Sequence, residues 1–96
     1  MARRIVEGNI HPVGYVQSSS FSSAAALPTI PASANIALIV VEDQTVRWRD
    51  DGSDPTSSVG MVWNLNTEYM YTGDLSTIKI IQTAATAKLN ISYYSS

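Results

Sequence analysis

The feature that most constrains the fold is the succession of short β-rich runs after Pro31, each bounded by turn residues. Residues 35–42, "NIALIVVE", are almost continuously aliphatic, which is typical of a strand covered on both faces. Residues 44–49, "QTVRWR", alternate instead, so that Val46 and Trp48 share one face of a strand. Three more short runs with turn residues at their borders follow, at residues 59–63, 67–71 and 77–82.

The last run, "AKLNISYY" at residues 87–94, alternates most regularly and places Leu89, Ile91 and Tyr93 on one face. Short strands with turns at intervals of about eight to twelve residues are typical of sandwiches and small barrels. The sequence therefore predicts an all-β domain over residues 32–96, a small β-sandwich or jelly-roll-like barrel. Between two of its strands, "EDQ" at residues 42–44 predicts a tight hairpin connection.

The first 31 residues differ from the rest, since "SSSFSSAAALPTIP" at residues 18–31 has no charge and no sustained period. Such a stretch cannot form a core of its own. We expect residues 1–31 to be an extended N-terminal arm, with short strands around residues 13–16 and 20–24, that orders against another surface. Phe21 is then a candidate partner contact, and a terminus without fixed structure is the alternative.

Charged residues are scarce, at 15% of the 96 residues against about 25% in typical globular domains. We therefore expect other protein to cover part of the surface. The net charge of −2 predicts no attraction to nucleic acid or an anionic membrane, and the absence of cysteine excludes disulfides and thiolate zinc sites.

No targeting or membrane segment is expected. The start, "MARRIVEGNI", has no apolar stretch long enough for a signal peptide. The longest apolar run, residues 36–41, falls far short of the roughly 20 residues that span a bilayer. We expect a soluble protein made in the cytosol.

The densest chemistry lies in "VRWRDDGSDPT", residues 46–56. Asp50, Asp51 and Asp54 could supply oxygen ligands to calcium, but their spacing departs from the alternating acidic pattern of an EF-hand loop. Aspartates in a loop rich in Gly, Ser and Pro more often accept hydrogen bonds from their own backbone. We therefore expect no metal site.

Arg47 and Arg49 lie two residues apart, so a strand places both on one face about 7 Å from each other. They could bind a phosphate or a sugar acid, or pair with carboxylates such as Asp51 within the chain or on a neighbouring subunit. Pairing with carboxylates is the favoured interpretation.

An enzyme is not expected. His11 is the only histidine, and the chain has no cysteine nucleophile, no nucleophile-elbow motif and no phosphate-binding glycine loop. A glycosidase pair could be drawn from Asp51, Glu68 and Asp74, but so small a domain offers little room for a deep cleft. We also expect no cofactor.

The aromatic residues divide by alternation. Trp48, Trp63 and Tyr93 share faces with aliphatic residues and are expected in the core. Tyr69 and Tyr71 share another face, so we keep them as candidates for a binding or subunit surface, together with Tyr94.

Two stretches, residues 46–61 and 71–94, resemble small proteins encoded by tailed bacteriophages. The shared features are an Arg-x-Arg-Asp-Asp-Gly strand end, a "PT-x-SVGM" loop, a "YTGDL" turn and an "AKLN-x-SYY" terminus. The resemblance covers roughly residues 37–94. It departs from the family pattern at "VWNLNTEYM", residues 62–70, and in the Ser/Ala-rich arm. In plan the chain is also similar to β-sandwich decoration, or cement, proteins of phage capsids.

This resemblance implies a non-enzymatic virion protein, made in the host cytoplasm, that decorates the capsid by binding major capsid proteins as a homotrimer. The residues expected at subunit or partner contacts are Arg47, Arg49, Asp51, Tyr69, Tyr71 and Phe21. The alternative is a head- or tail-fibre module that binds host glycans through Tyr69, Tyr71, Trp63 and the acidic loop.

Overall fold

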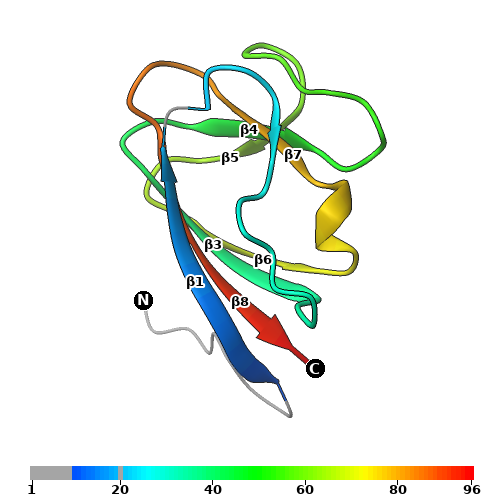
Figure 1. Ribbon diagram of the computed structural model, residues 1–96. Helices are drawn as coiled ribbons and strands as arrows, with labels where there is room; N and C mark the ends of the chain where they lie inside the picture. Colours follow the sequence, from blue (N-terminus) through cyan, green and yellow to red (C-terminus); the bar gives the residue numbers. More distant parts are fainter. Residues whose placement is uncertain (1–9, 20) are drawn as a thin grey trace.

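The computed structural model describes residues 10–19 and 21–96, which form two four-stranded antiparallel sheets packed as a sandwich (Figure 1). The first sheet has the order β1 (His11–Ser19), β8 (Lys88–Ser95), β3 (Ile36–Glu42) and β6 (Glu68–Thr72). The second sheet has the order β2 (Ala25–Ala26), β7 (Lys79–Gln82), β4 (Val46–Arg49) and β5 (Met61–Trp63). One 3-10 turn, η1 (Leu75–Thr77), precedes β7.

This architecture confirms the predicted fold class, an all-β sandwich. The finer jelly-roll assignment stays a prediction.

The core lies between the two sheets and is built from the alternating positions of the strands. Leu89, Ile91 and Tyr93 on β8 are buried, whereas Lys88, Asn90 and Ser92 between them are only half-buried. On β7, Ile80 faces the core and Lys79 does not, while Ile78 before the strand is buried as well. The predicted inward faces of these two segments are therefore confirmed, because side-chain direction alternates strictly along a paired strand.

The aliphatic strand β3 is fully covered on one face only. Ala37, Ile39 and Val41 are completely buried in the core, while Leu38 and Val40 on the opposite face are half-buried. The expectation that this run is covered on both faces is thus correct for its inner face and too strong for its outer face. Aliphatic composition alone does not reveal which side of a strand lacks a covering layer.

The connection from β3 to β4 is not the predicted hairpin. β3 pairs with β6 and β8, whereas β4 pairs with β5 and β7, so the chain passes here from one sheet to the other. The turn is very tight, with the backbone N–H of Gln44 donating to the carbonyl of Glu42 at 2.8 Å and Asp43 at a φ of 72°. The tight turn was correctly expected, but a turn this short is equally able to join strands of different sheets.

The described part of the expected N-terminal arm packs within the sandwich. β1 pairs with β8 along its whole length, β2 pairs with β7, and Phe21 and Leu27 lie in the core with 5% and 3% of their surface exposed. The backbone N–H of Gln82 also donates to the carbonyl of Phe21 at 3.0 Å. The surface against which this stretch orders is therefore the chain's own sheets. The rest of the expected arm, residues 1–9 and 20, lies outside the described residues.

A β-bulge near the start of β1 explains why this strand has no clear alternation in its sequence. The register shifts between Pro12 and Gly14, so that Val13 is an extra residue opposite β8. Val13 and Val16 consequently both pack against the core, although an odd spacing would place them on opposite faces of a regular strand.

Candidate functional site

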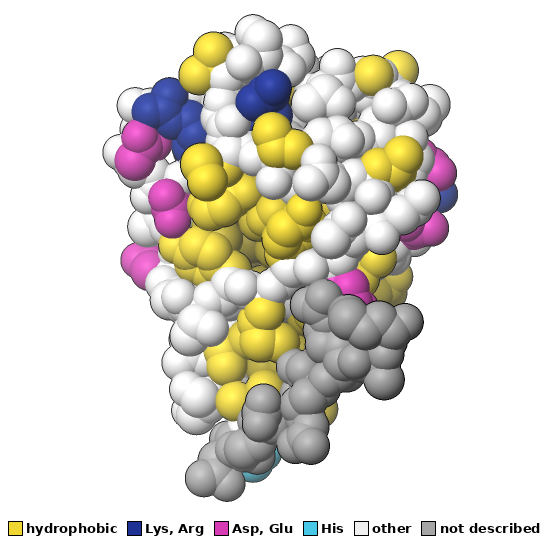
Figure 2. Space-filling view, turned by 180° about the vertical axis from the view of Figure 1, so that it is seen from behind, with side chains coloured by type: hydrophobic (Ala, Val, Ile, Leu, Met, Phe, Trp, Pro, Cys, Tyr) yellow, Lys and Arg dark blue, Asp and Glu magenta, His cyan; other side chains and the backbone are white. Residues whose placement is uncertain are grey.

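The edge strands β5 and β6 lie on the same side of the sandwich, and aromatic side chains fill the space between them. Figure 2 views this side and shows hydrophobic side chains gathered across it. Trp48 and Trp63 come from the second sheet, and Tyr69 and Tyr71 come from β6 in the first sheet. All four pack against the hydrophobic core or form part of it.

The four rings form a continuous row. The ring of Tyr71 packs edge-on against Trp48, with 5.9 Å between the ring centroids. Trp48 stacks on Trp63 at a centroid distance of 5.1 Å, and the centroids of Trp63 and Tyr69 lie 6.1 Å apart. Edge-on and offset-stacked contacts at these distances are favourable. Because the indole faces of Trp48 and Trp63 contact each other and Trp63 is only 3% exposed, these rings offer little flat surface to a sugar.

Two hydrogen bonds anchor the row at its tyrosines. The hydroxyl of Tyr71 donates to Asp50 Oδ2 at 2.8 Å, and the hydroxyl of Tyr69 accepts from the backbone N–H of Asn64 at 2.9 Å. The bond to the Asp50 carboxylate, together with burial, raises the pKa of Tyr71. Tyr69 and Tyr71, expected at a partner surface, thus have their rings against the core and their hydroxyls bonded within the chain.

Arg47 holds the loop between β4 and β5 in place. Its Nε donates to the carbonyl of Ser57 at 3.2 Å, and its Nη1 donates to the carbonyl of Gly60 at 2.8 Å. The same loop is closed by reciprocal backbone hydrogen bonds between Thr56 and Val59, at 2.8 and 3.2 Å. Charge-assisted bonds to two carbonyls make this arginine a clamp on the loop.

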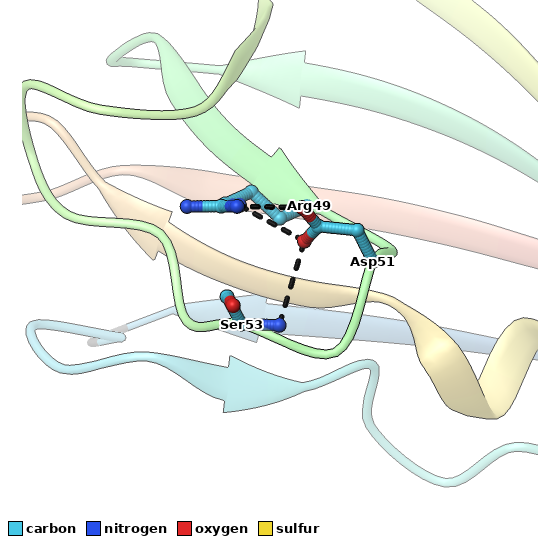
Figure 3. Close-up of polar contacts among 3 residues, drawn as sticks. All are labelled: Arg49, Asp51 and Ser53. Carbon is cyan, nitrogen blue, oxygen red and sulfur yellow. Dashed lines mark hydrogen bonds and ion pairs between the residues drawn. The ribbon is translucent and has the colours of Figure 1, made fainter.

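Arg49 and Asp51 form a bidentate ion pair (Figure 3). Arg49 Nε donates to Asp51 Oδ1 at 3.0 Å and Nη2 donates to Oδ2 at 2.5 Å, while Oδ1 also accepts from the backbone N–H of Ser53 at 3.4 Å. The arginine lowers the pKa of the Asp51 carboxyl, and the carboxylate raises the pKa of the guanidinium. The pairing favoured from the sequence is therefore present within the chain for Arg49, together with the expected turn-type bond to the backbone, whereas Arg47 binds backbone carbonyls and not a carboxylate.

A pocket of about 300 Å³ lies beside this ion pair, at the point where β5 begins. It is lined by Arg49, Asp50, Asp51, Val59, Gly60 and Met61. Large apolar side chains on β5 and in its flanking segments are exposed: Met61 at 61%, Val59 at 53%, Leu65 at 41% and Val62 at 38%. We call the pocket and these four side chains the β5 surface.

Sequence reasoning did not single out the β5 surface, because alternation places Val59, Met61 and Trp63 on one face of their strand and Trp63 was expected in the core. Only Trp63 is buried. The clue available in the sequence was the brevity of the run and the turn residues at both ends, which are typical of an edge strand.

Phe21 is not part of this site. It lies in the core. Tyr94, which was also kept as a surface candidate, is 9% exposed and does not belong to the core cluster. Arg49, Asp51 and, through Asp50, Tyr71 are the predicted residues that come together beside the β5 surface.

A separate polar group lies on the outer face of the first sheet. Asn90 Oδ1 accepts hydrogen bonds from the hydroxyl of Tyr15 at 2.6 Å and from Gln17 Nε2 at 2.9 Å, and Asn90 Nδ2 donates to Glu42. Each bond joins neighbouring strands, from β1 across β8 to β3. Since these polar groups satisfy one another, the network serves the sheet itself.

Comparison with known proteins found no match to a protein-family model, a curated protein or a solved structure. Within residues 10–19 and 21–96, no three or more His, Asp or Glu side chains gather as a metal-binding group. In the same residues, no helix has the length and apolar character needed to cross a membrane.

Proposed function

We propose that this chain is a non-enzymatic structural protein that docks onto other protein chains, and that it decorates or cements the capsid of a tailed bacteriophage. The observation that carries the docking proposal is the β5 surface, where Val59, Met61, Val62 and Leu65 are exposed along an edge strand that has a pocket at its start. Burial of exposed apolar area is the main driving force of protein association.

The partner is, in this proposal, the major capsid protein. The sequence resemblance of residues 46–61 and 71–94 to tailed-phage proteins supports it. Low charge supports it as well, since charged residues are depleted at the centre of protein interfaces.

The polar residues next to the β5 surface support a structural role. Arg47 binds two loop carbonyls, Arg49 pairs with Asp51, and Asp50 accepts from Tyr71. Each interaction fixes the shape of the loop that borders the pocket. A shape fixed before binding lowers the entropy lost on docking, which is what a decoration protein needs.

The test is co-sedimentation of the purified protein with undecorated phage capsids. The expected result is saturable pelleting in a fixed ratio to the capsid protein, with the free protein a homotrimer in light scattering. Met61→Lys should lose pelleting, because it places a charge on the β5 surface. Met70→Lys is the matched control, since Met70 is 44% exposed on β6 at a position paired with Leu38, away from this surface.

Wild-type protein that stays in the supernatant at all concentrations contradicts the proposal. Equal loss of pelleting in both lysine variants would show that capsids are bound elsewhere. The glycan-binding alternative predicts saturable titration with host polysaccharide, and the mutual stacking of Trp48 and Trp63 gives it no support.

A further inference from the structure

We propose that the β5 surface binds an extended segment of a partner protein, which adds as a strand to the outer edge of β5 and carries a basic side chain at its end. The proposal rests on the proposed function, because it specifies how the docking partner is recognised. The bound segment is a peptide strand with apolar residues followed by lysine or arginine.

The outer edge of β5 has no partner strand in the described part of the chain, because β5 is the last strand of the second sheet. Natural sheets protect such edges with charges, prolines or inward-pointing lysines. The residues of β5 are Met61, Val62 and Trp63, which include none of these.

The other edge strands are better protected. β1 contains Pro12 and β6 begins with Glu68, while β2 has only two residues and is followed closely by Pro28. β5 is also short, but exposed apolar side chains extend its surface from Val59 to Leu65. An added strand would therefore gain main-chain hydrogen bonds and apolar contacts together.

The pocket at the start of β5 offers a place for one side chain of the added strand. Its volume of about 300 Å³ is at the lower limit for small-molecule sites and suits an inserted side chain. Val59, Gly60 and Met61 form its apolar wall, and Met61 is the first residue of β5. Side-chain pockets next to a sheet edge give strand addition its specificity.

Charge complementarity decides the chemistry of the occupant. The loop after β4 carries Asp50, Asp51 and Asp54, while Arg49 precedes it and Arg47 binds two of its carbonyls, so that three carboxylates exceed two guanidiniums by one charge. Arg49 is already paired with Asp51. A basic side chain on the partner would neutralise this excess negative charge. Opposite charges at an interface favour association and fix the register of the partners.

The direction of the added strand follows from its neighbours. All strand pairs of both sheets are antiparallel among the described residues, and antiparallel pairs are the commoner kind. A strand antiparallel to β5 runs from the Leu65 end toward the Met61 end. Its C-terminal end therefore reaches the acidic loop, so the basic residue follows the apolar ones in the partner.

The experiment uses the full chain and three synthetic peptide pools. The first has Val, Ile or Thr at successive positions and Lys or Arg at its C-terminal end. The second replaces the basic end with Asp or Glu, and the third keeps the basic end but has proline at the centre. We expect saturable binding of the first pool in fluorescence anisotropy, and binding weaker by about tenfold or more for the other two.

Two pairs of variants assign the binding to this surface. Met61→Lys should weaken binding of the basic pool by about tenfold, whereas Met70→Lys should leave it within about twofold. Asp54→Asn should weaken it by a few-fold and reduce its salt dependence, whereas Asp43→Asn, on the β3–β4 turn, should not. Circular dichroism melting checks that all variants fold.

Equal binding of the proline pool overturns strand addition, and equal binding of the acidic pool overturns the basic occupant. If the protein pellets with capsids but binds none of the pools, the strand-addition mode is wrong and the proposed function stands. If it does neither, both are wrong. Concentration-dependent self-association that Met61→Lys abolishes would assign the surface to a second copy of the chain and also overturn the peptide proposal.

Discussion

The hydroxyl of Tyr71 on β6 donates a hydrogen bond of 2.8 Å to Oδ2 of Asp50, the residue directly after β4. Because β6 belongs to the first sheet and β4 to the second, this bond ties the two sheets together on the side where both have an edge strand. The ring of Tyr71 also packs edge-on against Trp48. One residue thus fixes both the aromatic row and the loop that borders the β5 surface.

Tyr71→Phe should lower the free energy of unfolding by about 1 kcal/mol, since it removes one hydrogen bond to a carboxylate while keeping the ring. Urea denaturation measures the effect. Tyr94→Phe is the matched control, because the described residues form no hydrogen bond with the Tyr94 hydroxyl. If both variants are as stable as the wild type, the link between Tyr71 and Asp50 adds nothing to stability.

Arg47→Ala should loosen the loop between β4 and β5. Losing the bonds to the carbonyls of Ser57 and Gly60 should make the amide hydrogens of Thr56 and Val59 exchange about tenfold faster. Hydrogen exchange followed by NMR measures this directly. Arg49→Ala removes a solvent-exposed ion pair instead and should leave these amides unchanged, because exposed pairs contribute little. Equal acceleration in both variants would argue against the clamp.

Gly60→Ala should destabilise the protein more than Gly52→Ala. Both glycines have a positive φ, 143° at Gly60 and 89° at Gly52, so alanine is strained at either position. Only at Gly60 would the added methyl group also crowd its neighbours, at 3.2 Å from Pro55 Cβ and from the Trp48 carbonyl oxygen.

We expect a loss of about 1 kcal/mol for Gly52→Ala and about 2 to 3 kcal/mol for Gly60→Ala. Thermal and urea unfolding of both variants provide the comparison. A larger loss of unfolding free energy for Gly52→Ala would mean that Pro55 and Trp48 can move away from a methyl group at position 60.

Tyr93 should make the protein less stable at alkaline pH. Burial raises the pKa of Tyr93 from 10.0 to about 12, and its hydroxyl donates to the carbonyl of Pro28 at 2.5 Å. The folded state therefore keeps this proton at pH values where the unfolded state loses it. The contribution is complete below pH 10 and is lost as pH rises to about 12, a change of about 2 to 3 kcal/mol.

Urea denaturation at a series of pH values from about 9 to about 12 measures this loss. Tyr71, whose pKa is also raised, adds to it with the same sign. Tyr93→Phe should be less stable at neutral pH, because it leaves the Pro28 carbonyl without its donor, but its stability should fall less steeply with pH. An identical slope in this variant would rule out Tyr93 as the titrating group.

The candidate site was only partly predictable from the sequence. The pairing of Arg49 with a nearby carboxylate could be expected, since two residues close in sequence meet without help from the rest of the fold. The contact of Asp50 with Tyr71 joins residues 21 positions apart and depends on how the sheets stack. For the same reason, nothing in the local pattern indicated that Tyr69 and Tyr71 would face the core, and the brevity of the run around Met61 was the one local clue to an exposed edge.

The sequence by itself determined the all-β class, the positions of most strands and the inward faces of β7 and β8. Those features depend on side-chain alternation and turn residues, which are local properties. Only the tertiary structure decided that Glu42 to Gln44 joins two sheets, that β1 and Phe21 complete the sandwich, and that β5 is an edge. Sheet pairing joins segments distant in sequence, and which apolar side chains remain exposed depends on that pairing.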